Sequence, residues 1–511
     1  MGYIIKEANN LEHHQDRRLV SPNLDDAEKP NSALAERIAS SQPPPYSVFF
    51  SAQKKWIVFI AALAGWFSAA SSFIYFPAIP FLARDTDVTV ENINLTVTSY
   101  LIASGIFPSI TGDAADRYGR RPVFIVCISV YAAVNVGLAV QRSFASLFVL
   151  RMIQSAAISG TLSIAYGIIG DLTTPAIRGG YTGFVSIFIN TPPSVAPLIS
   201  GLLLTRWSWP SIFWFLTIAS ATVLLTIIFF LPETRRSIVG NGSIRPPLIN
   251  ASPITILCPS QRTKEQEPCN KSKAGLLNPL SVLSLLGNYS TLLAICCFGV
   301  YYTIYSCLQA SLSTIFVETY NITGLVAGLS YIPFGVSCMI STFLAGKIID
   351  RDYRKTAESC GMSIDQFRGN DISKMPIEHA RLRTTKYCVA LCAPLVAGYG
   401  WAIQLKAHIA LPLALQFLIG FTMQPLFTAS DLSLCSLNTL LVDFHPERSS
   451  SVQAANNLVR CELGAAGLAV LDPMLRALRP GWCFVIFAII HSLTLPALWI
   501  LGKRGPNWRR Q

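Results

Sequence analysis

Two segments of this chain repeat one pattern: residues 112–121 read GDAADRYGRR, and residues 346–355 read GKIIDRDYRK. Both fit G-x-x-x-D-R-x-x-R-[RK], where x is any residue. Each copy directly follows the second long apolar stretch in its half of the chain. One such match can arise by chance, but two at equivalent positions indicate a duplicated unit. The repeat therefore predicts two related halves of six helices each.

Working outward from the repeat, the chain has twelve apolar stretches that can cross a bilayer, which takes about 20 helical residues. They cover residues 56–82, 92–112, 121–141, 144–170, 180–204, 209–231, 288–316, 323–348, 386–404, 409–442, 452–474 and 482–502. Of 511 residues, 51% are hydrophobic and 13% are charged, against roughly 25% charged residues in soluble domains. We therefore expect an all-α membrane protein with twelve transmembrane helices. The tenth stretch is too long for one span, and Ala429–Cys435 interrupts it.

The charged connections set the expected orientation. Lys and Arg gather in alternate loops, which the positive-inside rule places in the cytoplasm together with both chain ends. The polar start does not resemble a signal peptide. The expected division is a disordered cytoplasmic N-terminal tail (1–54), a first six-helix bundle (55–231), a cytoplasmic central loop (232–287), a second six-helix bundle (288–502) and a cytoplasmic C-terminal tail (503–511).

Other function classes lack sequence support. The net charge of +12 suggests nucleic acid, but in a membrane protein it reflects basic cytoplasmic loops. Most of the 13 cysteines lie in apolar runs and are expected to be free thiols. The six histidines form no metal-binding pattern, and phosphate-loop and nucleophile-elbow motifs are absent from the sequence. We therefore expect no enzyme activity, no cofactor, no metal site and no nucleic-acid partner.

The charged repeat also suggests a gate. Its glycines permit tight turns, and its Asp and Arg side chains can pair with charges on neighbouring helix ends. Such pairs would hold one face closed and break when the halves rock; a basic loop that only sets topology is the alternative. The candidate gate residues are Gly112, Asp116, Arg117, Gly119, Arg120, Arg121, Asp171, Arg178, Asp350 and Arg351.

Polar side chains within the spans form a second set, because ionisable groups in a bilayer are costly and face a cavity or a partner. Arg151 binds an anion, tunes a proton-carrying acid, or extends to the outer interface. Arg460 lies on a polar stripe that favours packing or cavity lining. The candidates for substrate or proton coupling are Arg151, Gln154, Tyr75, Tyr301, Tyr305, Asn457 and Arg460. No acid lies deep in the first, fourth or seventh helix, so the proton site stays open, with Glu462 as one candidate.

Two N-x-T sequons fall on the expected outer side of the membrane, at Asn94 and Asn321. Asn94 lies close to the bilayer. We therefore expect glycosylation at Asn321 alone.

These residues resemble the major facilitator superfamily over about residues 50–510. The segment GDAADRYGRR is similar to the family signature G-x-L-a-D-r-x-G-r-[kr], and Arg151 with Gln154 is similar to the fourth-helix motif R-x-x-q-g. The segments SSFIYFPAIP, FFLPETRR and AANNLVRC resemble fungal twelve-span drug:proton antiporters, in the branch of citrate-exporter-like and secondary-metabolite efflux proteins. In the fifth-helix antiporter motif, two glycines have become Ala196 and Ser200, while the packing residues Pro197 and Gly201 remain.

The resemblance implies two pseudo-symmetric six-helix bundles around a central cavity that opens alternately to each face. It assigns Asp116, Arg117 and Arg120 to a cytoplasmic gate, and Arg151 to proton coupling or substrate binding. The expected function is proton-coupled export of a lipophilic metabolite or drug from a plasma-membrane or vacuolar location. The alternative is an organic-acid exporter of the citrate type, in which Arg151 and Arg460 would pair with carboxylates.

A third possibility, a non-transporting nutrient sensor, is disfavoured by the short C-terminal tail. The expected partners are a small-molecule substrate, a proton and the lipid bilayer. We expect the chain to act as a monomer.

Overall fold

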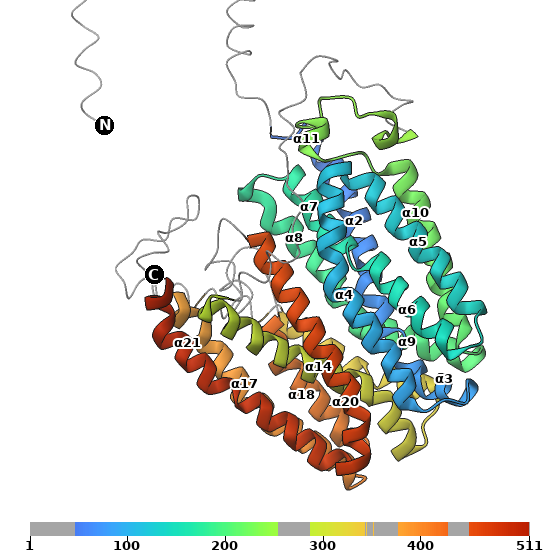
Figure 1. The fold of residues 1–511 in the computed structure, drawn as a ribbon, viewed down its shortest axis with the longest axis vertical. Coiled ribbons are helices and arrows are strands. Elements are labelled where there is room, and N and C mark those ends of the chain that lie inside the picture. The colour runs from blue at the N-terminus through green and yellow to red at the C-terminus, as the bar shows by residue number, and fades with distance from the viewer. Residues whose placement is uncertain are drawn as a thin grey trace, which may run out of the picture. The chain divides into compact units, whose positions relative to one another are not determined.

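The computed structural model describes residues 46–253, 287–342, 344, 351, 377–427 and 449–509. Within these residues every assigned element is a helix, which confirms the all-α prediction (Figure 1). Several predicted features lie outside the described residues: most of the N-terminal tail, most of the central loop (254–286), Asp350 and the Ala429–Cys435 interruption.

Proline and capping hydroxyls punctuate the apolar runs of the first half and so separate its helices. At the start of α4, for example, Thr89 Oγ1 accepts the backbone N–H of Asn92 over 3.3 Å. The elements are α2 (Ser51–Phe73), η1 (Phe76–Ala78), α3 (Ile79–Asp85), α4 (Val90–Tyr118), α5 (Arg120–Val140), α6 (Phe144–Ile158), α7 (Thr161–Leu172), α8 (Pro175–Asn190), α9 (Pro192–Arg206), α10 (Pro210–Phe230), α11 (Arg236–Val239) and η2 (Leu248–Asn250).

The second half is built from longer helices. Its first helix ends at Tyr320 because Asn321 turns the backbone into the left-handed region, with φ of 50°. The elements are α14 (Tyr289–Tyr320), α15 (Gly324–Leu329), α17 (Ile377–Gln404), α18 (Ala410–Phe427), α20 (Ser449–Ser492) and α21 (Thr494–Arg509).

The described helices account for twelve membrane crossings. Eleven segments are long and apolar enough to span a bilayer, and the last of them, Ala454–Arg504, has 51 residues. Arg479 breaks that segment with φ of 59° and ψ of 162°, since the following Pro480 cannot continue a regular helix. The segment therefore holds two spans, as the separate stretches 452–474 and 482–502 predicted.

Several helix ends differ from the predicted boundaries. The first helix begins at Ser51, inside the expected N-terminal tail, and α21 continues to Arg509, through most of the expected C-terminal tail. The tenth span is described from Ala410 to Phe427 as α18, and residues 428–442 of the predicted stretch 409–442 lie outside the described residues. Helical propensity extends past the apolar core because a membrane helix can continue into the water beyond it.

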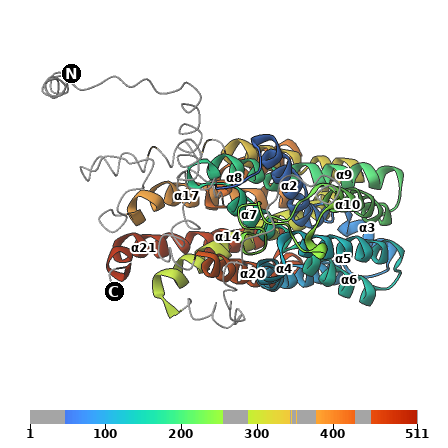
Figure 2. The ribbon, with the colours of Figure 1, turned by 90° about the horizontal axis from the view of Figure 1, so that it is seen from above.

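The most extensive contacts between the described parts of the two halves are two helix pairs. The longer contact joins α4 to α20, which lie side by side in both ribbon views (Figures 1 and 2). The second joins α9 to α15, where a Cβ on Gly201 would lie 2.9 Å from the Gly324 carbonyl oxygen, and one on Gly328 would lie 2.5 Å from the Pro197 carbonyl oxygen. Glycine thus lets two backbones touch, as is common between membrane helices.

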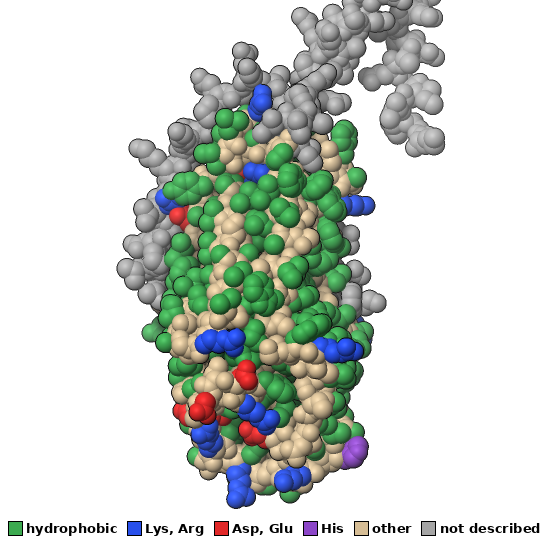
Figure 3. Space-filling view, turned by 90° about the vertical axis from the view of Figure 1, so that its right-hand side faces the viewer, with side chains coloured by type: hydrophobic (Ala, Val, Ile, Leu, Met, Phe, Trp, Pro, Cys, Tyr) green, Lys and Arg blue, Asp and Glu red, His purple; other side chains and the backbone are tan. Residues whose placement is uncertain are grey.

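The surface matches a membrane protein. On the face drawn in Figure 3, hydrophobic side chains cover most of the area and a band without charged side chains crosses its middle. Charged side chains lie toward the two ends of that face. Such a band is what the hydrocarbon core of a bilayer requires.

Candidate functional site

A cavity of about 970 Å³ lies between the two halves. Its walls come from α2, α4, α7 and α8 of the first half and from α14, α18 and α20 of the second. It runs from Tyr100 and Arg460, in the middle of their helices, to Asp116 and Arg120. We call the end of the bundle that carries Asp116 and Arg120 the basic-loop end, and the other the opposite end. A largely apolar cavity of this size can enclose an organic molecule.

Aromatic rings form one wall of the cavity. Tyr305 is the centre of this wall, with its ring centroid 5.5 Å from Phe427, 5.6 Å from Phe334 and 6.1 Å from Phe73. Tyr302 lies one turn away, 6.1 Å from Tyr305. The predicted residue Tyr305 therefore lines the cavity. The sequence did not single out Phe427, because an isolated Phe in an apolar run looks like any packing residue.

Arg460 supplies a cation to the same cavity. Asn457 Oδ1 accepts hydrogen bonds from Arg460 Nε (3.1 Å) and Nη2 (2.7 Å), and the guanidinium lies 4.8 Å from the Tyr302 ring centroid. Asn457 Nδ2 in turn donates to the Ser104 carbonyl oxygen over 2.9 Å, which ties α20 to α4. Among the described residues no carboxylate forms an ion pair with Arg460. Its charge is thus available to an anionic ligand.

Arg151 lies behind the cavity wall. Its side chain is fully buried, which shows that the alternative of extension to the outer interface is wrong. Nη1 donates to Gln154 Oε1 (2.6 Å) and to the Ser71 carbonyl oxygen (3.2 Å). The guanidinium also packs between two rings, 4.1 Å from the centroid of Tyr75 and 4.5 Å from that of Tyr100. Stacking on both rings stabilises a buried cation for which the described residues provide no acid.

One aromatic ring separates Arg151 from the cavity. Tyr100 contacts the Arg151 guanidinium and also lines the cavity, whereas Arg151 and Gln154 do not. Gln154 Nε2 donates to Asn135 Oδ1 over 2.6 Å, so both polar groups are held within the first half. Sequence reasoning missed Tyr100, since nothing in the pattern distinguishes it from other interface tyrosines.

Two other predicted tyrosines lie away from the cavity lining. Tyr75 is buried, and its hydroxyl shares a 2.8 Å hydrogen bond with Thr96 Oγ1. Tyr301 is buried on the other side of α14, where its hydroxyl donates to Thr494 Oγ1 over 2.8 Å and its ring centroid lies 5.0 Å from that of His491. The structure therefore brings Tyr305, Asn457 and Arg460 together, but neither of these tyrosines with them.

At the basic-loop end, the first copy of the repeat forms a chain of ion pairs. Asp116 Oδ1 lies 2.8 Å from Arg120 Nη2 and 2.7 Å from Arg235 Nη1. Arg120 Nε lies 3.2 Å from Asp171 Oδ2, so two predicted gate residues do meet. Arg117 pairs within its own helix, with Asp113 at 2.8 Å. All of these partners belong to the first half.

Glu233 anchors this cluster, and the sequence analysis did not select it. Its buried carboxylate accepts the backbone N–H of Arg120 (3.0 Å) and of Arg121 (3.3 Å), the first donors of α5. A carboxylate at a helix N-terminus satisfies these free donors and faces the positive end of the helix dipole. The signal for it was present as the acid in FFLPETRR, directly after the sixth apolar stretch.

Gly119 makes this capping possible. Its φ of 106° is a backbone conformation that side chains rarely allow. A Cβ there would lie 2.3 Å from Asn250 Nδ2 and 2.4 Å from Glu233 Oε2. Gly112, by contrast, lies within α4 with nothing within 4 Å of such a Cβ.

The remaining gate candidates are placed as follows. Arg121 Nη2 donates to the Ile228 carbonyl oxygen over 2.7 Å. Arg351 is exposed, whereas Asp350 and the side chain of Arg178 lie outside the described residues.

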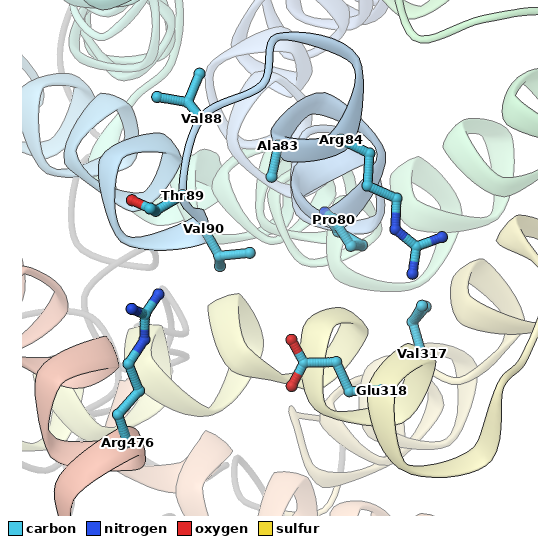
Figure 4. A pocket seen from close by; sticks show the side chains of 9 residues that line it. All are labelled: Pro80, Ala83, Arg84, Val88, Thr89, Val90, Val317, Glu318 and Arg476. Carbon is cyan, nitrogen blue, oxygen red and sulfur yellow. The ribbon is translucent and has the colours of Figure 1, made fainter.

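The opposite end has a smaller charged pocket of about 260 Å³ (Figure 4). Arg84 enters it from α3, Glu318 from α14 and Arg476 from α20, so charges of both halves face one space. Arg476 is also paired with Asp472 at 2.9 Å. Next to this pocket, Asn321 is exposed at the end of α14, whereas Asn94 is buried.

Comparisons with known proteins agree with this geometry. The sequence profile of the Major Facilitator Superfamily matches residues 61–469. The chain is 38% identical over 472 residues to the MFS-type transporter phiD of Fungal sp., covering 91% of this chain and 71% of that protein. It is 33% identical over 501 residues to citrate exporter 1 of Aspergillus niger, covering 96% and 94%. It is 33% identical over 524 residues to the multidrug transporter QDR2 of Candida glabrata, covering 96% and 87%.

Among solved structures, the fold is similar to that of a D-xylose-proton symporter. The TM-score is 0.61 at 14% sequence identity, over 87% of this chain and 96% of that one. The partially occluded, inward-open xylose transporter XylE of E. coli gives a TM-score of 0.60 at 15% identity, over 88% and 98%. At such low identity, these matches establish the fold alone.

Proposed function

Because this chain belongs to the Major Facilitator Superfamily, we propose that it exports a small organic metabolite or drug by proton-coupled alternating access. It is a multi-pass membrane protein with the twelve-helix fold of that family, in two bundles of six. Its relatives are named as transporters. We accordingly propose a carrier without enzyme activity.

The observation that carries the proposal is that, in the described part of the chain, the cavity is accessible from one side of the molecule. The cavity reaches the basic-loop end, whereas at the opposite end the α9–α15 glycines bring the halves into contact. If the basic loops face the cytoplasm, this is the state that admits a substrate from inside. Rocking of the halves would then release the substrate outside.

The cavity walls favour a lipophilic substrate. Aromatic rings around Tyr305 provide adaptable apolar contact, and hydroxyl and amide groups provide a few hydrogen bonds. The names of a fungal MFS-type transporter and of a multidrug transporter among the relatives agree with such a substrate.

An organic acid of the citrate type is the second candidate, and Arg460 specifically favours it. Arg460 presents to the cavity a guanidinium that forms no ion pair among the described residues, whereas Arg151 lies outside the lining. One relative is named a citrate exporter. A carboxylate substrate would therefore bind Arg460 directly, and Arg151 would act on it only through Tyr100.

Uptake into sealed inside-out vesicles with an imposed pH gradient tests both candidates. Labelled citrate and a panel of lipophilic compounds are offered in parallel. Gradient-driven uptake of several lipophiles supports the first candidate, and uptake of citrate alone supports the second. Absence of uptake of either by folded protein would contradict the proposed function.

Arg460→Ala should separate the candidates further. Loss of a charge-assisted hydrogen bond would lower citrate uptake by roughly 10- to 100-fold and leave uptake of a neutral lipophile largely intact. Arg142→Ala is the matched control, because Arg142 is exposed in the loop before α6. Equal citrate uptake by both variants would exclude Arg460 as the carboxylate ligand.

We assign the gate to the basic-loop end. The cluster of Asp116, Arg120, Asp171 and Arg235 would stay within the first half in the open state. On closure it would face the second copy of the repeat, with Asp350 and Arg351, while Arg117 and Arg178 extend the basic surface. Buried Arg121 would support the gate by holding α5 to the Ile228 carbonyl oxygen.

The remaining proposals concern the oligomeric state, the membrane, the topology and the glycosylation of the chain. We propose that the chain acts as a monomer in the plasma membrane, with the vacuolar membrane as the alternative. Residues 1–54, 232–287 and 503–511 would lie in the cytoplasm. Asn321 would carry the glycan on the outer side. Fluorescence of a tagged chain tests the location, and a gel shift lost in Asn321→Gln tests the glycan.

A further inference from the structure

Acidic side chains in the described spans lie almost entirely near helix ends. Asp113 and Asp116 occupy the last turns of α4, and Asp171 lies one residue before the end of α7. At the opposite end, Glu318 lies two residues before the end of α14, and Asp472 is paired with Arg476 near the Arg479 break. Each of these acids can therefore reach water or a basic partner.

Glu462 is different, because it lies in the middle of a span. It is 13 residues from Ser449 and 17 from Arg479, which at 1.5 Å per residue places it about 20 Å or more from either end of the helix. Its carboxyl group lies next to Gly105, which is equally central in α4 (Val90–Tyr118). Among the described residues, Glu462 forms no ion pair.

The packing around Glu462 is shaped to accept it. A Cβ on Gly105 would lie 3.1 Å from Cys461 Cβ and 3.4 Å from Glu462 Oε1, so the missing side chain leaves room for the carboxyl group against α4. The Gly105 carbonyl oxygen also accepts a 3.3 Å hydrogen bond from Asn457 Nδ2, which lines the cavity. Gly105 thus contacts Glu462 and also binds Asn457, which lines the cavity.

The groups that face Glu462 carry little charge. From residue 101 to residue 111, the part of α4 around Gly105 has no ionisable side chain. On its own helix, Arg460 turns toward the cavity and Cys461 toward α4. An ionised carboxylate held here would lack compensation, whereas a protonated one needs none.

We propose that Glu462 carries the coupled proton. This rests on the proposed proton-coupled export and names the residue that performs it. The carboxyl group binds one proton and releases it as the carrier changes state. It occupies the α4–α20 contact, the longer contact between the halves, so the movement that opens and closes the cavity also changes its surroundings.

The direction of coupling follows from the conformation described above, which is open at the basic-loop end. Glu462 is partly exposed, and its protonated carboxyl group fits against Gly105 in the α4–α20 contact, so protonation stabilises the state open at the basic-loop end. Loss of the proton leaves a carboxylate that favours a wetter arrangement of the two helices. A proton bound from the opposite end would thus be released at the basic-loop end, while substrate moves the other way.

A distance measurement tests this without any substrate. Fluorophores are attached through introduced non-natural residues at positions 118 and 503, near the ends of α4 and α21. The purified full chain is followed by single-molecule energy transfer from pH 5 to pH 9. In the unmodified sequence, the separation should shorten as pH rises. Glu462→Gln should hold the long distance throughout, and Glu462→Asp should restore the transition with a shifted midpoint.

Glu91→Gln is the matched control, because it neutralises an acid at the start of α4, far from Gly105. It should keep the transition of the unmodified sequence. The same transition in Glu462→Gln, or no pH dependence in the unmodified sequence, would overturn the assignment.

The vesicle assay distinguishes a wrong assignment of Glu462 from a wrong proposed function. If the unmodified chain shows proton-driven uptake and Glu462→Gln shows it too, the assignment of Glu462 is wrong and proton-coupled export still holds. If Glu462→Gln does not fold, Glu462→Asp decides: an unshifted midpoint counts against the proposal, and a shifted one supports it.

Discussion

Arg151 and Arg460 are each an arginine within a span, one in each half, yet their surroundings differ. Arg460 faces the cavity, while Arg151 is enclosed by Tyr75 and Tyr100. Sequence reasoning selected both because a charge in an apolar run is conspicuous. It could not separate them, since burial depends on which neighbouring helix covers each side chain.

The two glycines of the repeat motif also differ in a way that the sequence does not show. Gly112 and Gly119 belong to one motif, but only Gly119 has a positive φ and would place a Cβ against Glu233. The motif predicted tight turns at both. The clash at Gly119 depends on a residue more than 100 positions later in the chain, which local sequence does not reveal.

Gly119→Ala should therefore destabilise the protein by about 1–3 kcal/mol, the cost of a strained backbone conformation. Thermal unfolding of the purified chain in detergent measures the effect. Gly112→Ala serves as its control and should be neutral or stabilising by about 0.5–1 kcal/mol, because alanine favours a helix interior. Equal melting temperatures for the two variants would refute the role of Gly119.

At the scale of elements, the break at Arg479 shows what sequence predicts well. The prediction separated the last two spans because a charged turn with Pro480 and Gly481 interrupts the apolar run. Punctuating residues locate helix ends better than hydropathy does.

Helix α14 shows why lining residues are harder to predict. Tyr301 and Tyr305 lie one turn apart and were selected as one polar face. The cavity boundary passes between them, so Tyr302 and Tyr305 line it whereas Tyr301 packs on Thr494. The rotation of a helix about its axis is set by packing with its neighbours.

The α9–α15 contact makes a prediction at this scale. Gly328→Ala would place a Cβ 2.5 Å from the Pro197 carbonyl oxygen and should push the two helices apart. Closure at the opposite end then weakens, and a cysteine introduced near position 321 becomes more reactive toward an impermeant maleimide. Gly183→Ala in α8, where a Cβ meets nothing within 4 Å, should leave that reactivity unchanged. Unchanged reactivity in Gly328→Ala would show that this contact does not close the opposite end.

For the whole molecule, the twelve-span fold could be predicted because the bilayer fixes span length and because the repeat marks equivalent positions in each half. The cavity could not, since it arises where helices of both halves face each other. Its polar members Asn457 and Arg460 were found, but the aromatic partner Phe427 was not.

The charged pocket at the opposite end offers a test of motion between the halves. Arg84 of the first half and Glu318 of the second face one space (Figure 4). Arg84→Glu should shift the equilibrium toward opening at that end by about two- to five-fold, the scale of a partly exposed ion pair. The energy-transfer distance at the basic-loop end, which shortens as the opposite end opens, reports the shift.

Reversing both charges completes this test. Adding Glu318→Arg to Arg84→Glu should restore the original distribution of distances. A double variant no closer to the unmodified chain than Arg84→Glu alone would rule out attraction between these two side chains.

The Glu233 cap and the ion pairs around Asp116 are complete within the first half. The first half therefore holds its gate cluster in place with its own residues. Hybrids that join this first half to the second half of a citrate or multidrug relative would keep the cluster intact. Such recombined carriers would exchange Tyr302, Tyr305, Phe427 and Arg460 as one block while keeping Phe73, and substrate choice would follow the donor of the second half.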